Sequence, residues 1–418
     1  MTAGAQPEPQ RRTARTVHIY PADLVRVLTF ACVIAVHTVS TVNPLDSVPG
    51  GAVVMLLHFT REAFFVLTAF VLTHRHRDDP VRPVAFWRRR FLLVGLPYVM
   101  WSVVYTGLGL VTAPLPAREA ATMLLRNVLT GTAWFHLYFL LVSLQFYLVF
   151  PLFRRLLLAT RGRHVVLLAV SAVLQVLIDL WLHDPTPAGL KASLLPYAGS
   201  FLLSYQFFLV LGGVVAFHAG RVDAWIRGHT VVIVAAVLLT GALAEGRYQW
   251  TVAHGAGAEF ATDVFQPVMV PWSVAVTAAF YAAGAAWADR RAGGPASRVV
   301  EAASDRSFGV FLLHPTVLWA LTVAGPASPA ALLPAPWSSI AVYAVAVGGS
   351  LAIVEVLQRT PLSLALTGKS RRRPRRPATA RPAAGETQWR EAARVRPIPT
   401  SGSRTPGGLL GKADHRCP

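Results

Sequence analysis

Charged residues are scarce in this sequence. Of its 418 residues only 14% are Asp, Glu, Lys or Arg, whereas a typical soluble domain contains about 25%. The two cysteines, Cys32 and Cys417, are too few for a disulfide framework or a cysteine-based zinc site. The 31 glycines show no period of three, which excludes a collagen-like chain. These shortages argue against a soluble globular protein, a disulfide-rich protein and a fibrous protein.

Long apolar runs, in contrast, are abundant. Hydrophobic residues make up 54% of the chain and its mean hydropathy is +0.48. A helix needs about 20 mostly apolar residues to cross a bilayer. The sequence therefore predicts an all-α integral membrane protein with about ten transmembrane helices. The predicted spans are 20–42, 51–73, 91–111, 133–153, 164–183, 197–217, 230–245, 265–287, 307–325 and 337–358.

Basic residues outnumber acidic ones by 39 to 20, which gives a net charge of +19. Such an excess can indicate nucleic-acid binding, but here the basic residues lie between the apolar runs and at the two ends, with no basic domain. With the N-terminus in the cytoplasm, 33 of the 39 fall in cytoplasmic segments and 4 in loops on the other side. The positive-inside rule therefore predicts that both termini are cytoplasmic. No nucleic-acid partner is predicted.

The composition divides the chain into three parts. Residues 1–19 form a polar cytoplasmic N-terminal tail, and 20–358 form the membrane domain. Residues 359–418 are rich in Arg, Pro, Ala and Gly and are predicted to be a disordered cytoplasmic tail. Its Lys369–Arg376 cluster either contacts anionic lipid head groups or acts only as a stop-transfer anchor. Segment 115–131 has the apolar spacing of a short interfacial helix.

The first predicted span contains Asp23, Arg26 and His37. Charged groups at bilayer depth are costly and are therefore functional candidates. Arg26 and His37 are eleven residues apart, which places them on one helix face and about 16.5 Å apart along the axis. Asp23 is one turn from Arg26 and can pair with it. Alternatively, Asp23 and Arg26 extend to the membrane interface and His37 only packs against a neighbouring helix.

The second predicted span contains His58, Arg61 and Glu62. His58 and Glu62 are four residues apart and would share a helix face. A buried Glu–His pair can act as a general acid or base, since each group shifts the pKa of the other. It can equally be an ion pair that locks two helices. The usual ligand spacing and a third ligand are missing, so no metal site is predicted.

Two further histidines lie in the predicted spans. His136 stands among aromatic residues, which are typical of a membrane interface. His314 is followed by Pro315, and a proline inside a helix frees a backbone carbonyl and kinks the helix. This arrangement either serves packing only or presents His314 to a cavity.

At these residues the chain resembles the acyltransferase-3 family of integral membrane acyltransferases. Arg26 and His37, with ten residues between them, resemble the family's Arg-x10-His signature on the first helix. The resemblance covers about residues 20–358, and further family motifs follow in the same order. The stretches that resemble these motifs are Arg61–Phe70, Phe86–Phe91 with Pro97-Tyr98, Trp134–Pro151 and Ser307–Pro315.

The sequence departs from the family pattern in three respects. Thr68-Ala69 stands where Ser-Gly is usual, and Leu92–Val94 stands where the family often has a further Arg. No extracytoplasmic hydrolase-like domain follows the last predicted span. We therefore expect transfer either without a fused partner or with the help of a separate extracytoplasmic protein.

The resemblance implies transfer of an acyl group, commonly acetyl, from cytoplasmic acyl-CoA. The acceptor would be a hydroxyl or amine of a cell-surface glycan, a lipid-linked sugar or a secondary metabolite. The protein would lie in the plasma membrane as a multi-pass enzyme. It would hold no bound cofactor, with acyl-CoA, normally acetyl-CoA, as a co-substrate.

The resemblance also implies roles for the donor-side residues. Arg26, together with Arg88, Arg89 and Arg90, would bind the CoA phosphates, because guanidinium groups bind phosphate oxygens bidentately. The rise of about 16.5 Å to His37 suits a pantetheine arm. His37 would then act as a general base or carry the acyl group covalently.

Other ionisable residues would support His37. Glu62 or Asp23 would orient its imidazole as further catalytic residues. The predicted substrate-binding residues are Arg61, His136 and His314.

Two other classes of protein remain possible from the residues. One is a transporter or flippase for an anionic lipid-linked substrate, which intramembrane Arg and Glu would suit. Inverted internal repeats would favour it, and the sequence shows none. The other is a non-catalytic membrane scaffold, for which Arg26 and His37 would be dispensable.

Overall fold

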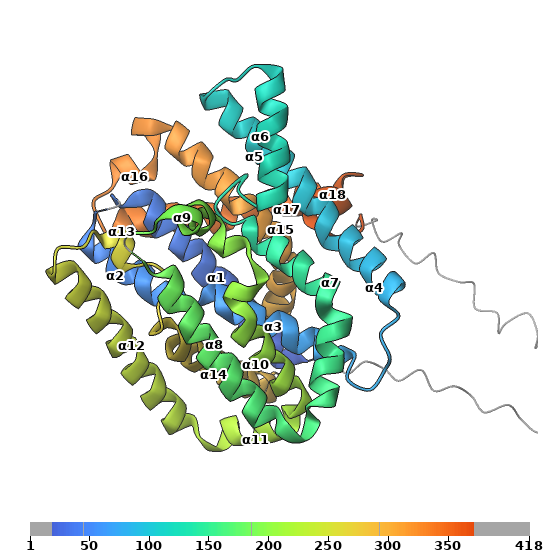
Figure 1. Cartoon of the computed structure of the whole chain (residues 1–418). Helices are drawn as coiled ribbons and strands as arrows, with labels where there is room; N and C mark the ends of the chain where they lie inside the picture. Colours follow the sequence, from blue (N-terminus) through green and yellow to red (C-terminus); the bar gives the residue numbers. More distant parts are fainter. Residues whose placement is uncertain (1–18, 45, 185, 292, 372–418) are drawn as a thin grey trace, which may run out of the picture. The chain divides into compact units, whose positions relative to one another are not determined.

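The computed structural model describes residues 19–44, 46–184, 186–291 and 293–371, which are helical and include no strand. Figure 1 shows the helices in sequence order. The α-helices are α1 (Tyr20–Val42), α2 (Val48–Leu57), α3 (Thr60–Arg75), α4 (Pro83–Arg90), α5 (Leu96–Thr112), α6 (Ala117–Thr130), α7 (Tyr138–Ala159), α8 (His164–Leu182), α9 (Gly189–Leu194), α10 (Gln206–Phe217), α11 (Ala219–Gly228), α12 (Thr230–Ala253), α13 (Ala258–Ala261), α14 (Met269–Arg290), α15 (Pro295–Val323), α16 (Pro329–Leu332), α17 (Trp337–Leu357) and α18 (Ser363–Thr367). Short 3₁₀ or π segments are η1 (Phe91–Gly95), η2 (Arg161–Arg163), η3 (Leu195–Ser200), η4 (Leu202–Tyr205) and η5 (Gly325–Ala327).

Within the described ranges, nine helical segments are long and apolar enough to cross a membrane. The segments Gly189–Ser200 and Leu202–Phe217 meet at 58° and together provide a tenth, bent span. The chain is thus an all-α integral membrane protein, as the sequence predicts. Several predicted spans are shorter than the helical segments that contain them; for example, 230–245 is the first part of α12, and 307–325 overlaps the second part of α15. Hydropathy marks only the apolar part of a helix, and polar turns extend both.

Helix α1 lies inside the bundle. It packs against α14, α15, α17, α2 and α3 (Figure 1). Its buried residues occur on more than one face, and they include Val25, Phe30 and Ile34. Because α1 is central, residues that are far apart along this helix lie at different depths within the bundle.

Glycines allow two pairs of helices to approach closely. A Cβ on Gly212 of α10 would lie 2.2 Å from the Val66 carbonyl oxygen on α3. A Cβ on Gly284 of α14 would lie 2.6 Å from the Pro21 carbonyl oxygen on α1. Small residues are the usual means of close helix packing in membranes. These contacts hold α3 and α1 against their neighbours and fix the positions of the residues they carry.

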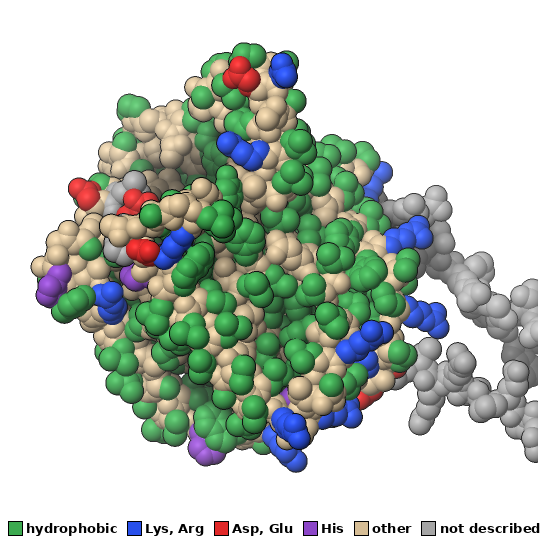
Figure 2. Space-filling view, viewed as in Figure 1, with side chains coloured by type: hydrophobic (Ala, Val, Ile, Leu, Met, Phe, Trp, Pro, Cys, Tyr) green, Lys and Arg blue, Asp and Glu red, His purple; other side chains and the backbone are tan. Residues whose placement is uncertain are grey.

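The outward surface of the bundle is apolar. On the face shown in Figure 2, hydrophobic side chains cover the middle of the molecule, and most charged side chains lie toward its edges. Outward-facing residues of α8, such as Val165, Val170 and Leu177, are exposed. An apolar surface of this extent is suited to contact with lipid rather than water.

The predicted disordered tail begins too early at residue 359. Helix α18 packs against α5 and α15, and the Trp101 indole N–H donates to the Leu366 carbonyl at 2.9 Å. Ser363 and Thr367 are buried. The segment before Lys369 is still apolar, so it packs on the bundle instead of extending into water. The other predicted tail residues, 1–18 and 372–418, lie outside the described residues.

Candidate active site

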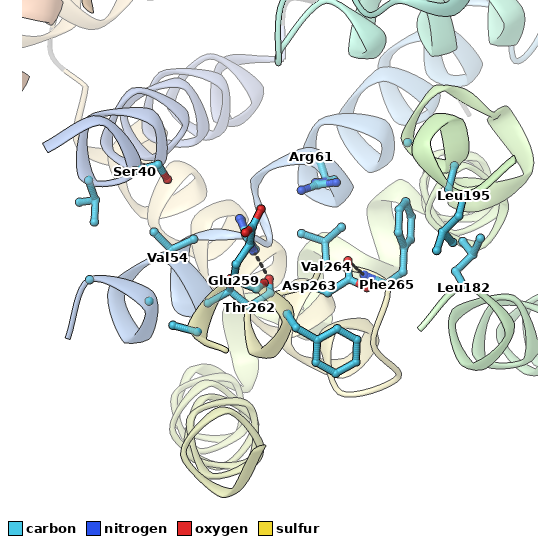
Figure 3. Close-up of a pocket in the computed structure, with 18 of the residues that line it drawn as sticks. Ser40, Val54, Arg61, Leu182, Leu195, Glu259, Thr262, Asp263, Val264 and Phe265 are labelled. Atoms are coloured by element: carbon cyan, nitrogen blue, oxygen red, sulfur yellow. Dashed lines mark hydrogen bonds between the residues drawn. The ribbon is translucent and has the colours of Figure 1, made fainter. Parts of the chain in front are cut away.

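Three cavities follow one another through the bundle. The Arg26 cavity, of about 320 Å³, is lined by residues that include Arg26, Phe64 and Phe139. The His37 cavity, of about 390 Å³, is lined by His37 and again by Phe64 and Phe139. The Glu259 cavity, of about 590 Å³, is shown in Figure 3. It shares three lining residues with the His37 cavity, which are Ser40, His58 and Arg61.

A hydrogen-bonded group holds the guanidinium of Arg26. Its Nη1 donates to the Ser304 hydroxyl at 3.2 Å, and that hydroxyl donates to the Asp23 carboxylate at 3.0 Å. The Arg26 and Asp23 side chains form an ion pair at 3.8 Å. Asp23 lies fourteen residues before His37 on α1, or about 21 Å along the axis. The predicted role of Asp23 in orienting His37 is therefore wrong, and Asp23 instead positions Arg26.

Only one of the three predicted α4 arginines lines the Arg26 cavity. Arg90 lies over the rings of Phe86 and Tyr147, at 5.6 and 5.4 Å. Arg88 and Arg89 are exposed and do not line it, because successive helical residues point about 100° apart. The expectation that Arg88, Arg89 and Arg90 lie together at one site is therefore wrong, and only Arg90 borders this cavity.

Lys369 supplies a further cation from the segment after α18. It lines the Arg26 cavity and is paired with Asp305. Sequence reasoning placed Lys369 in a disordered tail and did not assign Ser304 a role at all. The signal for Ser304 was weak, since it precedes the apolar run by which the ninth span was recognised.

Three imidazoles meet at the other end of α1. The His37 ring lies 5.4 Å from the His314 ring and 4.3 Å from the Phe135 ring, between centroids. The His136 ring lies 5.6 Å from that of His314. His136 and His314 are 2% and 0% exposed, whereas His37 is partly exposed. The structure thus brings together the three histidines that the sequence singled out on α1, before α7 and on α15.

The proline after His314 determines how this imidazole is held. In an uninterrupted helix the N–H of residue 315 would donate to the carbonyl of Phe311, but Pro315 has no N–H. The His314 Nδ1 is instead hydrogen-bonded to the Phe311 carbonyl at 2.8 Å, and it lies 3.3 Å from the carbonyl of Val310. A carbonyl only accepts, so Nδ1 carries the proton. The Nε2 of His314 is then an acceptor, without a hydrogen-bond partner among the described residues.

His136 is held by aromatic contacts. Its ring centroid lies 5.2 Å from that of Tyr105, 5.7 Å from that of Phe135 and 5.1 Å from that of Phe311. A neutral imidazole offers one donor and one acceptor. His136 lines the His37 cavity, so a molecule bound there can reach its imidazole.

The predicted His58–Glu62 acid–base pair does not form. Helix α2 ends at Leu57 and α3 begins at Thr60, so the break between them removes the four-residue register on which the pairing depended. The ring Nδ1 of His58 instead donates to the Thr262 carbonyl at 2.8 Å.

Glu62 does not orient His37 either, contrary to the prediction. It is buried near Arg61 and Asp179 and does not line the His37 cavity. Arg61 does line that cavity and lies 5.7 Å from the Tyr138 ring centroid. Among the described residues, no three His, Cys, Asp or Glu side chains are arranged to hold a metal ion.

Comparison with known proteins identifies the bundle. The family model of an acyltransferase domain, Acyl_transf_3, matches residues 19–355. The chain belongs to the acyltransferase-3 family. It is therefore a membrane acyltransferase, and the matched stretch contains all the cavity-lining residues named above except Lys369. No curated protein and no solved structure matches this acyltransferase.

Proposed function

We propose that this acyltransferase moves an acyl group, in the simplest case acetyl, from cytoplasmic acyl-CoA to an acceptor on the opposite side of the plasma membrane. The acceptor offers a hydroxyl or amine and is a glycan, a lipid-linked sugar or a secondary metabolite. The observation that carries the proposal is the row of cavities along α1, with Arg26 in the first and His37 in the second.

The charge distribution supports the direction of transfer. The Lys and Arg residues are concentrated in loops and ends on one side of the predicted spans, which the positive-inside rule assigns to the cytoplasm. The N-terminal end of α1, with Arg26, belongs to that side. Acyl-CoA is made in the cytoplasm and its phosphates do not enter an apolar layer, so the donor would arrive at the Arg26 cavity.

The Arg26 cavity suits the charged end of the donor. It is lined by three cations, Arg26, Arg90 and Lys369. Guanidinium groups bind phosphate oxygens bidentately, and an ammonium binds them as a point charge. The Asp23–Ser304 group holds Arg26 in place before the donor arrives, which lowers the cost of ordering it on binding.

The His37 cavity suits the chemical step. His37 takes the proton from the acceptor hydroxyl while the hydroxyl oxygen attacks the thioester carbonyl. The resulting tetrahedral intermediate then collapses, and the bond to the CoA sulfur breaks. The proton on His37 then passes to that sulfur, which leaves as the thiol. His136 can donate a ring N–H to the carbonyl oxygen as negative charge develops on it. A covalent acyl-His37 intermediate would use the same geometry.

The Glu259 cavity suits a polar acceptor. Glu259 is exposed on α13, and Asp263 follows this helix (Figure 3). Burial raises the pKa of Asp263, but hydrogen bonds from His183 and the Phe265 N–H lower it by more. The net effect is a lowered pKa, so the group remains a carboxylate. Carboxylates and Arg61 offer both acceptors and donors to a molecule rich in hydroxyl groups.

The proposal is tested by acyl transfer in isolated membranes. Wild type, Arg26→Ala and His37→Ala are supplied with radiolabelled acetyl-CoA and envelope extract, and label is followed into the acceptor pool. Arg89→Ala is the matched control, because Arg89 is exposed and lines no part of the Arg26 cavity. We expect label with wild type and Arg89→Ala only. Equal label with all four proteins at equal expression would contradict the proposed roles and favour a transport function.

A further inference from the structure

Four phenylalanine rings form a closed cycle inside the bundle. The ring centroids of Phe30 and Phe64 are 4.5 Å apart, and those of Phe64 and Phe139 are 5.3 Å apart. Phe311 closes the cycle, at 5.6 Å from Phe139 and 5.7 Å from Phe30. These residues lie on α1, α3, α7 and α15, respectively. We call them the Phe collar.

The Phe collar lies between the Arg26 cavity and the His37 cavity. Phe64 and Phe139 line both cavities, Phe30 lines the first and Phe311 lines the second. On α1, Phe30 lies four residues after Arg26, a rise of about 6 Å, and seven residues before His37, a rise of about 10.5 Å. The separation between the two cavities is thus one layer of aromatic side chains.

Both sides of this layer are polar and connect to solvent. The Arg26 side chain is 34% exposed. On the other side, the His37 cavity shares Arg61 with the Glu259 cavity, where Glu259 is exposed. Phe146, which is also a core phenylalanine, borders none of these cavities. The collar is therefore placed where an apolar barrier would separate two wet compartments.

We propose that the Phe collar is a hydrophobic gate. Without donor it closes the bundle to water and ions, because a narrow apolar constriction excludes water. The neutral thioester arm of the donor turns the rings aside, passes to His37 and fills the opening itself. The identity of the molecule that opens the gate depends on the proposed function. The inference that the collar blocks water and ions depends only on its position between the two cavities.

A collar that is filled by the arm also protects the donor. A thioester that waits beside His37 without an acceptor would be open to hydrolysis if water reached it from both sides. Excluding water from a reactive group is a common consequence of active-site closure. The collar lets water reach the thioester from one side only, so the acceptor hydroxyl competes with fewer water molecules for the acyl group.

The gate is tested by proton leak in proteoliposomes that contain no donor. Phe64→Ala and Phe139→Ala are reconstituted with a trapped pH-sensitive dye, and a pH gradient is imposed with the membrane potential clamped. We expect leak at least about fivefold faster than wild type, since a widened apolar constriction becomes hydrated. A thioether analogue of acetyl-CoA, which cannot be cleaved, should slow it again.

Phe146→Ala is the matched control. Phe146 lies on α7 like Phe139, is 1% exposed and packs against Phe150 and Phe153, but it borders neither cavity. Its loss should disturb packing without opening a path. Phe64→Leu serves if Phe64→Ala does not yield a monodisperse protein, and it should leak at an intermediate rate.

Folded Phe64→Ala and Phe139→Ala proteins that are as tight as wild type would overturn the gate. So would a leak of the same size in Phe146→Ala. The outcome is independent of the transfer assay: a leak in the collar variants, with label unaffected in Arg26→Ala and His37→Ala, would retain the gate and reject the proposed function. Collar variants that leak no faster than wild type, with label lost in Arg26→Ala and His37→Ala, would retain the proposed function and reject the gate.

Discussion

Pro315 controls the hydrogen bonding of the histidine that precedes it. The proline removes one N–H from α15, and the freed Phe311 carbonyl accepts from His314 instead. That bond selects the tautomer in which Nε2 is an acceptor. One residue without chemistry of its own thereby determines which nitrogen of a buried imidazole carries the proton. His314 lies beside His37 but lines none of the three cavities, so its predicted contact with substrate is not supported.

Replacing this proline tests the arrangement. In Pro315→Ala the new N–H can donate to the Phe311 carbonyl, so His314 loses its fixed orientation. We expect acyl transfer to fall roughly 2- to 10-fold, the equivalent of one hydrogen bond of about 0.5–1.5 kcal/mol. The unfolding temperature should not decrease. Pro151→Ala is the control, because Pro151 also lies inside a helix. Unchanged transfer in a folded Pro315→Ala protein would show that this bond does not matter.

Sequence reasoning at the residue scale succeeded where one uninterrupted helix was involved. Arg26 and His37 face the interior together because both lie on α1, whose geometry is regular. The pairing of His58 with Glu62 failed because the helix breaks between them. Arg88 and Arg89 were assigned wrongly because a single sequence does not give the rotation of α4 relative to its neighbours. The Phe collar was missed because its four members come from four separate helices.

At the scale of elements, close approach between helices holds the site. Helix α3 carries Arg61 and Phe64, and it lies against α10 at a distance that Gly212 alone permits. The same argument applies to α1 and α14 at Gly284. The sequence predicted the existence of the spans, because hydropathy is a local property, but several of their limits differ from those of the helices. It did not predict which helices pair, because that depends on the shapes of distant surfaces.

A pair of glycine substitutions tests this packing. In Gly212→Ala the added Cβ would overlap the Val66 carbonyl, and we expect a loss of about 1–3 kcal/mol in stability. Gly246 on α12 has no atom within 4 Å of the equivalent Cβ position, so Gly246→Ala should be neutral or slightly stabilising. The unfolding temperature in detergent measures both. A Gly212→Ala protein as stable as Gly246→Ala would mean that α3 and α10 are not held at this distance.

At the scale of the whole molecule, charge asymmetry predicts the orientation of the bundle in the membrane. The basic residues lie overwhelmingly on one side of the predicted spans. An even number of spans, ten if the bent pair crosses the bilayer, returns the chain to the side on which it starts. In this proposed orientation the Arg26 cavity would face the cytoplasm and the Glu259 cavity would face outward.

Reporter fusions test this orientation. A reporter active only in the cytoplasm and one active only outside it are fused in turn to each end of the chain. We expect the cytoplasmic reporter to be active at both ends, because 33 of the 39 Lys and Arg residues would otherwise be on the outside. Activity of the external reporter at the C-terminus alone would show that the bent pair does not cross the membrane.

The distance between Arg26 and His37 has an electrical consequence. On the proposed route the phosphates stay beside Arg26, and only the uncharged arm enters the bundle and withdraws as a thiol. A charge that crosses the membrane gains or loses about 2.3 kcal/mol per 100 mV, but here no net charge crosses. Each turnover would therefore be electrically silent. The membrane potential would neither drive nor oppose the delivery of the acyl group, and the thioester would supply all of the driving force.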